Sequence, residues 1–151
     1  KFKMAQLKNE MKFEFISKSS NESFARATVA AFIAQLDPTI SEIADIKTAI
    51  SEAVTNCIVH AYKNGLGYIY ISVKIFDNGQ VTIRIRDKGC GIENISQAME
   101  PLYTTGGAER AGLGFAVMQS FMDNIKVMSK VGRGTTITLT KNIIPRVTKN
   151  G

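Results

Sequence analysis

The feature that most constrains the fold is a pair of alternating segments joined by a tight turn. Residues 67–76 read GYIYISVKIF and residues 80–87 read QVTIRIRD. Apolar side chains recur at every second position in both segments, which is the period of a β-strand. Asp77-Asn78-Gly79 separates them, and Asn-Gly is the strongest short signal for a hairpin. The sequence therefore predicts two antiparallel strands joined at this turn.

Three other segments also have the pattern of strands. Residues 11–17, MKFEFIS, alternate in the same way. Residues 124–130 and 135–142 flank the turn 131–134, VGRG, and are predicted to form a last strand pair.

Two capping boxes mark the starts of predicted helices. Ser19–Glu22 opens a helix that we expect to run to about residue 36, because an Asp-Pro pair follows. Thr39–Glu42 opens a longer helix that we expect to reach about residue 63 and to end at an Asn-Gly pair.

The stretch between residues 88 and 114 is rich in glycine and is predicted to be irregular, apart from a short helix at 95–99. A helix is predicted at 114–123, GFAVMQSFMD. Helices and hairpins are thus grouped rather than strictly alternating, which favours an α+β sandwich over a doubly wound sheet.

Composition limits the classes of function. The 151 residues fit one domain, and no apolar run approaches the roughly 20 residues that span a bilayer, so we expect a cytoplasmic protein. The net charge of +6 suits nucleic acid, an acidic protein or a nucleotide equally well. Basic residues are scattered without interleaved aromatics, so direct nucleic-acid binding is not expected. Cys57 and Cys90 lie far apart, which argues against a zinc site.

Glu52, Asn56 and His60 recur every four residues within SEAVTNCIVHAY, residues 51–62. On a helix these positions lie along one face, beside an apolar stripe. The pattern by itself fits a solvated helix face as well as it fits a row of functional groups.

Two glycine-rich motifs follow. In RDKGCGI, Asp87 ends a predicted strand, and Gly89 and Gly91 follow at alternate positions, so this is a surface turn or a loop that approaches a ligand closely. In ERAGLGF, Gly112 and Gly114 directly precede a predicted helix, whose free N–H groups would form an anion site.

Taken in order, these motifs resemble the GHKL ATPase superfamily. The match consists of Glu-x3-Asn-x3-His, DxGxGI, a glycine-rich loop, GLGF before a helix, and GRGTT, and it spans roughly residues 51–136. The resemblance implies the Bergerat fold, a two-layer sandwich with helices on one face of a mixed, mostly antiparallel sheet. ATP and Mg²⁺ would bind between the long helix and a lid, which we place at residues 92–111.

The resemblance also implies individual roles. Asn56 would hold Mg²⁺, Glu52 would be the general base, and His60 would line the triphosphate or brace Asn56. Asp87 would bind the adenine amino group. The other expected nucleotide contacts are Gly89, Gly91, Ile92, Thr104, Thr105, Arg110, Gly112, Leu113, Gly114 and Thr135.

Three further stretches, NESFARATVAAFIAQLDPT, DIKTAISEAVTN and PLYTT…ERAGLGF, resemble the anti-sigma F factors of endospore-forming bacteria. Residues 9–143 would be the kinase domain, residues 1–8 a disordered or non-native start, and residues 144–151 a flexible tail. This group implies a homodimer that sequesters a sporulation sigma factor, partly through Arg26, and phosphorylates a serine of an anti-anti-sigma factor.

Three alternatives stay open. The first is a general-stress anti-sigma kinase of the same group. The second is a module that binds ATP to hold a partner and transfers nothing, although such a module has no need of Glu52 as a base. The third, the catalytic half of a histidine kinase, is disfavoured because the one histidine lies in the Mg²⁺ helix.

Overall fold

A computed structural model describes residues 4–63, 65–100 and 107–144. It contains a five-stranded sheet in the order β1-β2-β3-β5-β4, and every pairing along that order is antiparallel. The strands are β1 Leu7–Ile16, β2 Tyr68–Phe76, β3 Gln80–Asp87, β4 Asn124–Lys130 and β5 Gly134–Asn142. The hairpin predicted at residues 77–79 joins β2 to β3. The sheet is therefore antiparallel throughout these pairings, whereas the resemblance led us to expect a mixed, mostly antiparallel sheet.

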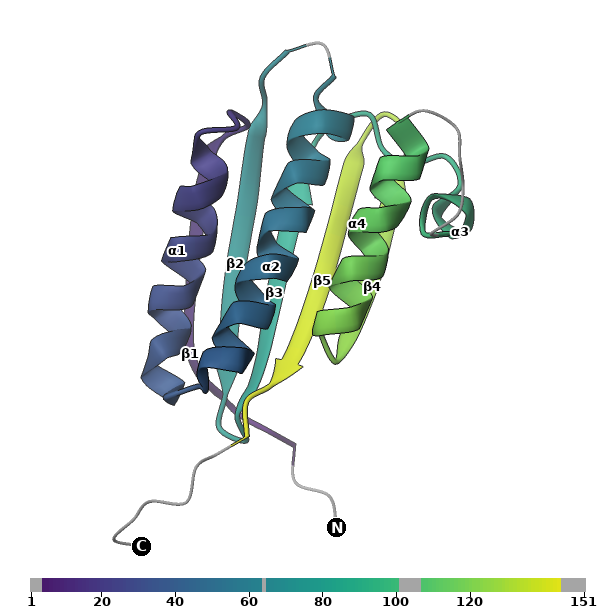
Figure 1. Ribbon diagram of the computed structural model, residues 1–151. Coiled ribbons are helices and arrows are strands. Elements are labelled where there is room, and N and C mark those ends of the chain that lie inside the picture. The colour runs from purple at the N-terminus through teal and green to yellow at the C-terminus, as the bar shows by residue number, and fades with distance from the viewer. Residues whose placement is uncertain (1–3, 64, 101–106, 145–151) are drawn as a thin grey trace, which may run out of the picture.

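The three long helices, α1, α2 and α4, cover one face of this sheet, with α2 between the other two (Figure 1). This arrangement confirms the α+β two-layer fold. The helical segments are α1 Asn21–Ile33, η1 Ala34–Leu36, α2 Ile40–Asn56, η2 Cys57–Ala61, α3 Ile95–Ala98 and α4 Gly107–Phe121. None of the helices in these described ranges is long and apolar enough to cross a membrane.

The two predicted capping boxes have different outcomes. At α2, Thr39 Oγ1 accepts from Glu42 N at 3.0 Å, and Glu42 Oε1 accepts from Thr39 N at 2.8 Å, so this box is confirmed. At α1 the box is wrong, because the N-cap residue is Ser20 and it makes no side-chain cap. Ser20 already has helical backbone angles, φ −63° and ψ −18°. A capping side chain reaches the following N–H groups from an extended residue.

Strand β1 begins at Leu7, so the folded domain starts inside the stretch that we expected to be disordered. Residues 145–151 of the expected tail lie outside the described residues. The long second helix continues past Asn56 as a π turn, η2, which the sequence pattern does not predict.

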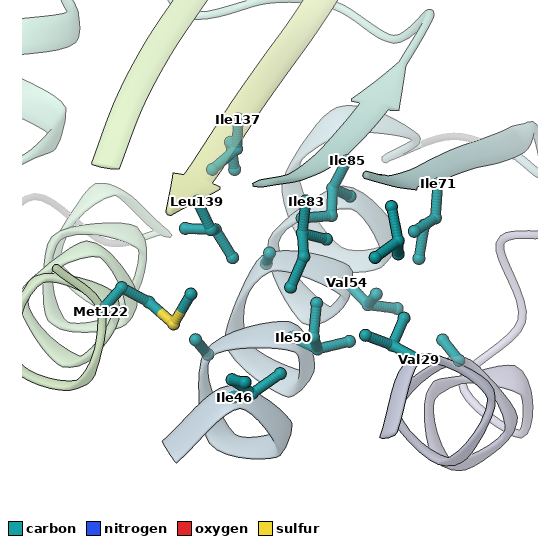
Figure 2. Close-up of a cluster of buried hydrophobic side chains, with 14 of the residues drawn as sticks. Val29, Ile46, Ile50, Val54, Ile71, Ile83, Ile85, Met122, Ile137 and Leu139 are labelled. Atoms are coloured by element: carbon teal, nitrogen blue, oxygen red, sulfur yellow. The ribbon is translucent and has the colours of Figure 1, made fainter. Parts of the chain in front are cut away.

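The core lies between the sheet and α2. Figure 2 shows side chains of α1 and α2 meeting those of the three central strands. Ile46, Ile50 and Val54 recur at the four-residue spacing of one helix face, and all three are fully buried. They pack against β-branched and leucine side chains at alternate strand positions, namely Ile71, Ile83, Ile85, Ile137 and Leu139. This packing fixes α2, and the polar residues beside its buried stripe, over the centre of the sheet.

Candidate nucleotide site

A pocket lies where the end of the long helix meets the ends of β3 and β5. Its lining residues are Asn56, Cys57, His60, Ala61, Asp87, Gly91, Ile92, Ala98, Phe115, Thr135 and Ile137. Residues from three of the motifs singled out in the sequence therefore meet in one place. A cavity of about 70 Å³ remains between these residues.

Asp87 is the most firmly held polar group of this pocket. Its Oδ1 accepts hydrogen bonds from Gly89 N at 3.0 Å and from Thr135 N at 3.2 Å, and its Oδ2 accepts from Cys57 Sγ at 3.4 Å. The residue is only 5% exposed. Burial raises the pKa of the Asp87 carboxyl, although all three hydrogen bonds oppose that rise. The result is a fixed hydrogen-bond acceptor in a largely apolar pocket.

Cys57 is a functional candidate that the sequence analysis missed. Burial, and next the negative charge of Asp87, raises the pKa of its thiol well above the usual value, so the thiol stays protonated and can donate to the carboxylate. In the sequence Cys57 reads as part of the apolar stripe. Only its position next to Asn56 could have drawn attention to it.

Glycine is required at two positions of the predicted motifs, because the backbone of another segment lies too close for a side chain. A Cβ at Gly89 would overlap the carbonyl of Ala61, to which the neighbouring Cys90 N donates at 3.1 Å. Gly91 has φ +79°, and a Cβ there would overlap the carbonyl of Lys130. Both glycines therefore pack the loop after Asp87 against its neighbours. Their contact with a nucleobase stays a prediction.

The structure separates the polar trio of the long helix. Asn56 and His60 line the pocket, whereas Glu52 lines a groove between α1 and α2 together with Arg26 and Ser51. Glu52 and Asn56 both lie in α2, before the π turn that begins at Cys57, and a spacing of four in an α-helix turns the second residue by about 40° around the axis. Glu52 and Asn56 thus face adjoining spaces, one helical turn apart.

The amide of Asn56 has unused hydrogen-bonding capacity. Its Nδ2 is buried and has no partner within the described part of the chain, and O and N of an amide are assigned from such networks. No cluster of three or more His, Cys, Asp and Glu residues occurs among the described positions. One amide oxygen without a cage suits Mg²⁺, which keeps several waters and takes phosphate oxygens as ligands. The residues present therefore fit that ion.

The predicted anion site before the last helix is not where the sequence placed it. Helix α4 begins at Gly107 rather than at Gly114, because Ala108–Ala111 are good helix formers and extend it. The N–H groups of Gly112, Leu113 and Gly114 therefore lie inside the helix, where they are not free donors. Leu113 is half exposed, and a Cβ at Gly114 would lie 3.2 Å from Asn56 Oδ1.

Three other expected phosphate contacts cannot be placed in the pocket. The side chain of Arg110 and the whole of Thr104 and Thr105 lie outside the described residues. Their contact with phosphates stays a prediction, as does that of Gly112, Leu113 and Gly114.

Thr135 supports Asp87 from the last strand. Its N–H donates to the carboxylate, and its hydroxyl lies 2.7 Å from Ser129 Oγ. Ser129 also accepts from Ile92 N at 2.7 Å and so ties the loop that covers the pocket to β4. No motif in the sequence points to Ser129. Its one signal is a polar residue at an alternate position of a predicted strand, where apolar residues are expected.

Comparison with known proteins agrees with this geometry. Residues 17–141 match the family described as "Histidine kinase-like ATPase domain". The chain is 60% identical over 136 residues to the anti-sigma F factor of Caldanaerobacter subterraneus subsp. tengcongensis, covering 89% of this chain and 94% of that protein. It is 52% identical over 139 residues to the anti-sigma F factor of Priestia megaterium, covering 91% and 95%.

Solved structures support the fold. The RsbU and RsbW domains of a Mycobacterium tuberculosis protein match with a TM-score of 0.66 at 22% identity, over 94% of this chain and 35% of that one. A histidine kinase domain from Erythrobacter litoralis matches with a TM-score of 0.54 at 16% identity, over 81% and 60%. From the pocket and from these matches together, the chain belongs to the histidine kinase-like ATPase domain family and, within it, to the anti-sigma F factors.

Proposed function

We propose that this protein is an ATP-dependent serine kinase and an anti-sigma factor. It sequesters a sporulation sigma factor and transfers the γ-phosphate of ATP to a serine of an anti-anti-sigma factor, and it acts as a homodimer. The observation that carries this proposal is the pocket that joins Asp87 to Asn56, in a chain 52–60% identical to anti-sigma F factors along nearly its whole length.

Asp87 is the residue that selects adenine. A buried, ionised carboxylate accepts a hydrogen bond from the exocyclic amine of adenine but opposes the carbonyl of guanine. Gly89 N and Thr135 N hold Oδ1, so Oδ2, which is bound only by the weak thiol donor, is the oxygen that faces the amine.

Asn56 would bind the Mg²⁺ ion that accompanies the phosphates of the nucleotide. When bound there, Mg²⁺ neutralises charge on the β- and γ-phosphate oxygens. The buried amide lies against Gly114 of α4, and its free hydrogen-bonding capacity supports this role.

Glu52 accepts the proton of the attacking serine. The serine oxygen bonds to the γ-phosphorus while the bond from that phosphorus to the bridging oxygen breaks, and ADP leaves. The serine proton passes to the Glu52 carboxylate. Glu52 lines the open groove between α1 and α2, next to the Asn56 pocket, where a protein hydroxyl can approach from solvent.

Arg26 marks the partner surface at the same groove. Its Nη1 lies 3.5 Å from Glu22 Oε2 and 3.4 Å from Ser51 Oγ, and Ser51 also donates to Glu22. The Arg26 side chain remains 41% exposed. The network therefore holds a cation in a fixed direction beside the residue that precedes Glu52, where it can bind an acidic group of a partner.

The test is a transfer assay. The protein is incubated with Mg·ATP and with the anti-anti-sigma protein encoded in its neighbourhood, and the phosphate is located by mass spectrometry. One phosphorylated serine on that protein supports the kinase. Nucleotide-dependent binding of a sigma factor without any transfer would instead identify an ATP-gated binding module.

A further inference from the structure

A row of polar side chains crosses the end of the sheet beside the nucleotide pocket. Asp87 on β3 pairs with Thr135 on β5, and Thr135 pairs with Ser129 on β4, so the three residues lie side by side on neighbouring strands. The burial pattern of each strand puts all three on the face that the helices cover. Asp87 and Thr135 line the pocket, and Ser129 extends the row beyond it.

The preceding row on the same face is entirely apolar. Ile85, Ile137 and Val127 occupy it in the same register, and Figure 2 shows Ile85 and Ile137 in the core. Strand residues that face a core are normally apolar. A hydroxyl that is partly buried at such a position loses hydration and needs hydrogen-bond partners in exchange. The partners of Ser129 therefore indicate what its hydroxyl does.

The Ser129 hydroxyl uses all of its hydrogen-bonding capacity. A serine hydroxyl has one proton and two lone pairs. Ser129 Oγ accepts from Ile92 N at 2.7 Å and donates to Gly134 O at 3.1 Å. Its one proton is then in use, so the network assigns the 2.7 Å contact with Thr135 Oγ1 to Thr135 as the donor.

This assignment fixes the direction of the Thr135 hydroxyl. Because its proton points to Ser129, its lone pairs are left to accept from a group in the pocket that Thr135 lines. Asp87 Oδ2 is an acceptor as well. Two acceptors suit the exocyclic amine of adenine, or a water that bridges to it, and they oppose the carbonyl of guanine, which needs a donor.

The same hydroxyl also holds the loop that follows Asp87. Ser129 Oγ binds the backbone N–H of Ile92, and Gly132 N in the β4–β5 turn donates to Cys90 O at 2.8 Å. Two hydrogen bonds thus tie this loop to the hairpin, and Ile92 lines the pocket. Ser129 therefore positions a hydroxyl and an apolar side chain of the pocket without lining it.

We propose that Ser129 is a positioning residue that contributes to nucleotide specificity. By accepting the hydrogen bond of the Thr135 hydroxyl, it leaves Thr135 able only to accept from the ligand. The inference rests on the proposed function, in which Asp87 selects adenine, and it adds a second determinant that acts through Thr135.

The test measures ATP and GTP affinities by calorimetry. In Ser129→Ala the Thr135 hydroxyl is free to rotate and donate to the guanine carbonyl, so the ratio of ATP to GTP affinity should fall at least about fivefold. Ser129→Thr keeps a hydroxyl on β4 and should restore the ratio to within about twofold of the wild type. Ser120→Ala is the matched control, because the Ser120 hydroxyl donates to Ala116 O of its own helix, and the ratio should not change.

Two further measurements show how Ser129 acts. In a Thr135→Val background, Ser129→Ala should leave the ratio unchanged, because the hydroxyl through which it acts is gone. Without nucleotide, hydrogen exchange of the Ile92 amide should be at least about tenfold faster in Ser129→Ala than in the wild type or in Ser120→Ala. Circular dichroism shows whether each variant is folded.

The outcomes separate this inference from the proposed function. If the wild type prefers ATP and folded Ser129→Ala loses affinity for ATP and GTP equally, or loses none, Ser129 is only structural and the inference is wrong. If Ser129→Ala still lowers the ratio in the Thr135→Val background, the action through Thr135 is overturned. A wild type without a preference for ATP overturns the adenine assignment of Asp87 and this inference with it.

Discussion

At the scale of single residues, burial raises the pKa of the Asp87 carboxyl and hydrogen bonding lowers it. Burial dominates and raises its pKa above the ordinary value of 3.8. A raised pKa in the folded state means that the folded protein binds this proton more readily than the unfolded chain does. The contribution of Asp87 to stability is therefore complete below about pH 3.8 and is lost as the pH rises through the raised value. Holding this buried acceptor ionised at neutral pH thus costs stability.

We expect Asp87→Asn to remove the pH dependence of ATP binding that Asp87 causes. In the wild type, ATP affinity should fall as the pH drops through the raised pKa of Asp87, because the protonated acid no longer accepts from the adenine amine. The variant should bind ATP more weakly at neutral pH, by on the order of 1–3 kcal/mol. It should also lose the preference for ATP over GTP and show no such pH dependence.

Isothermal calorimetry with both nucleotides across the acidic range measures this effect, and Asp77→Asn in the hairpin turn is the control. Equal ATP and GTP affinities in the wild type would contradict the assignment of Asp87.

Glu52→Gln separates chemistry from binding. Glutamine keeps the size of glutamate but cannot take the serine proton, and general-base assistance is worth roughly 10²–10⁴-fold. We expect Mg·ATP and sigma-factor binding near wild type, with single-turnover phosphoryl transfer at least about a hundredfold slower.

Asn56→Ala is the contrasting variant. It should lose Mg²⁺-dependent nucleotide binding as well as transfer, because its amide lies in the pocket and Glu52 does not. Wild-type transfer by Glu52→Gln would mean that the carboxylate has only a structural function.

At the scale of elements, α2 combines a capped start, a buried middle and a π turn at its end. The Thr39–Glu42 box fixes the first turn, and Ile46, Ile50 and Val54 fix the helix over the sheet. The π turn that follows carries Cys57 and His60, which line the pocket together with Asn56 at the end of α2. The site is thus built at the end of the element that is held most firmly.

Replacing the N-cap residue by alanine should affect the free energy of unfolding differently at α1 and at α2. Thr39→Ala removes a cap that accepts from Glu42 N, and should lower the free energy of unfolding by about 1 kcal/mol. Ser20→Ala at α1 removes no side-chain cap and should change it by less than about 0.5 kcal/mol. Urea unfolding midpoints at a common m-value measure both, and equal losses would contradict the assignment of the caps.

Nucleotide binding should change the hydrogen exchange of residues 92–111, the segment that we expect to form a lid. Ile92 and Ala98 line the pocket, so a nucleotide that binds there contacts the start of this segment. We expect amide hydrogen exchange in residues 92–111 to slow when ATP is saturating, whereas exchange in β1 should stay the same. Unchanged exchange in residues 92–111 would argue that this segment is not a lid.

At the scale of the whole molecule, the two layers give the protein separate working surfaces. The helical side presents the groove with Arg26 and Glu52, and the strand ends hold the nucleotide pocket. Because these surfaces share few residues, one substitution can be expected to affect one function at a time.

Arg26→Glu tests this separation. The substitution puts a negative charge beside Glu22 and removes the fixed cation, so binding of the sigma factor and of the anti-anti-sigma factor should weaken at least about tenfold. ATP affinity should stay at the wild-type value, because Arg26 does not line the nucleotide pocket. Pull-downs of both partners with Lys126→Glu as control make the comparison. Normal retention of both partners would place the contact surface elsewhere.

Local sequence patterns determined the elements of this protein, and tertiary packing decided the site. The hairpin, the alternating strands and the Thr39 cap depend on residues close in sequence, so their patterns were sufficient. The Cys57–Asp87 and Ile92–Ser129 bonds join residues far apart in sequence. The split of Glu52 from Asn56 depends on how α2 is set over the sheet. The earlier start of α4 and the absence of a cap on Ser20 show the limit even locally, because several backbone conformations suit the same residues. Only the packing of helices on the sheet selects among them, since burying the apolar side chains outweighs the small differences in local propensity.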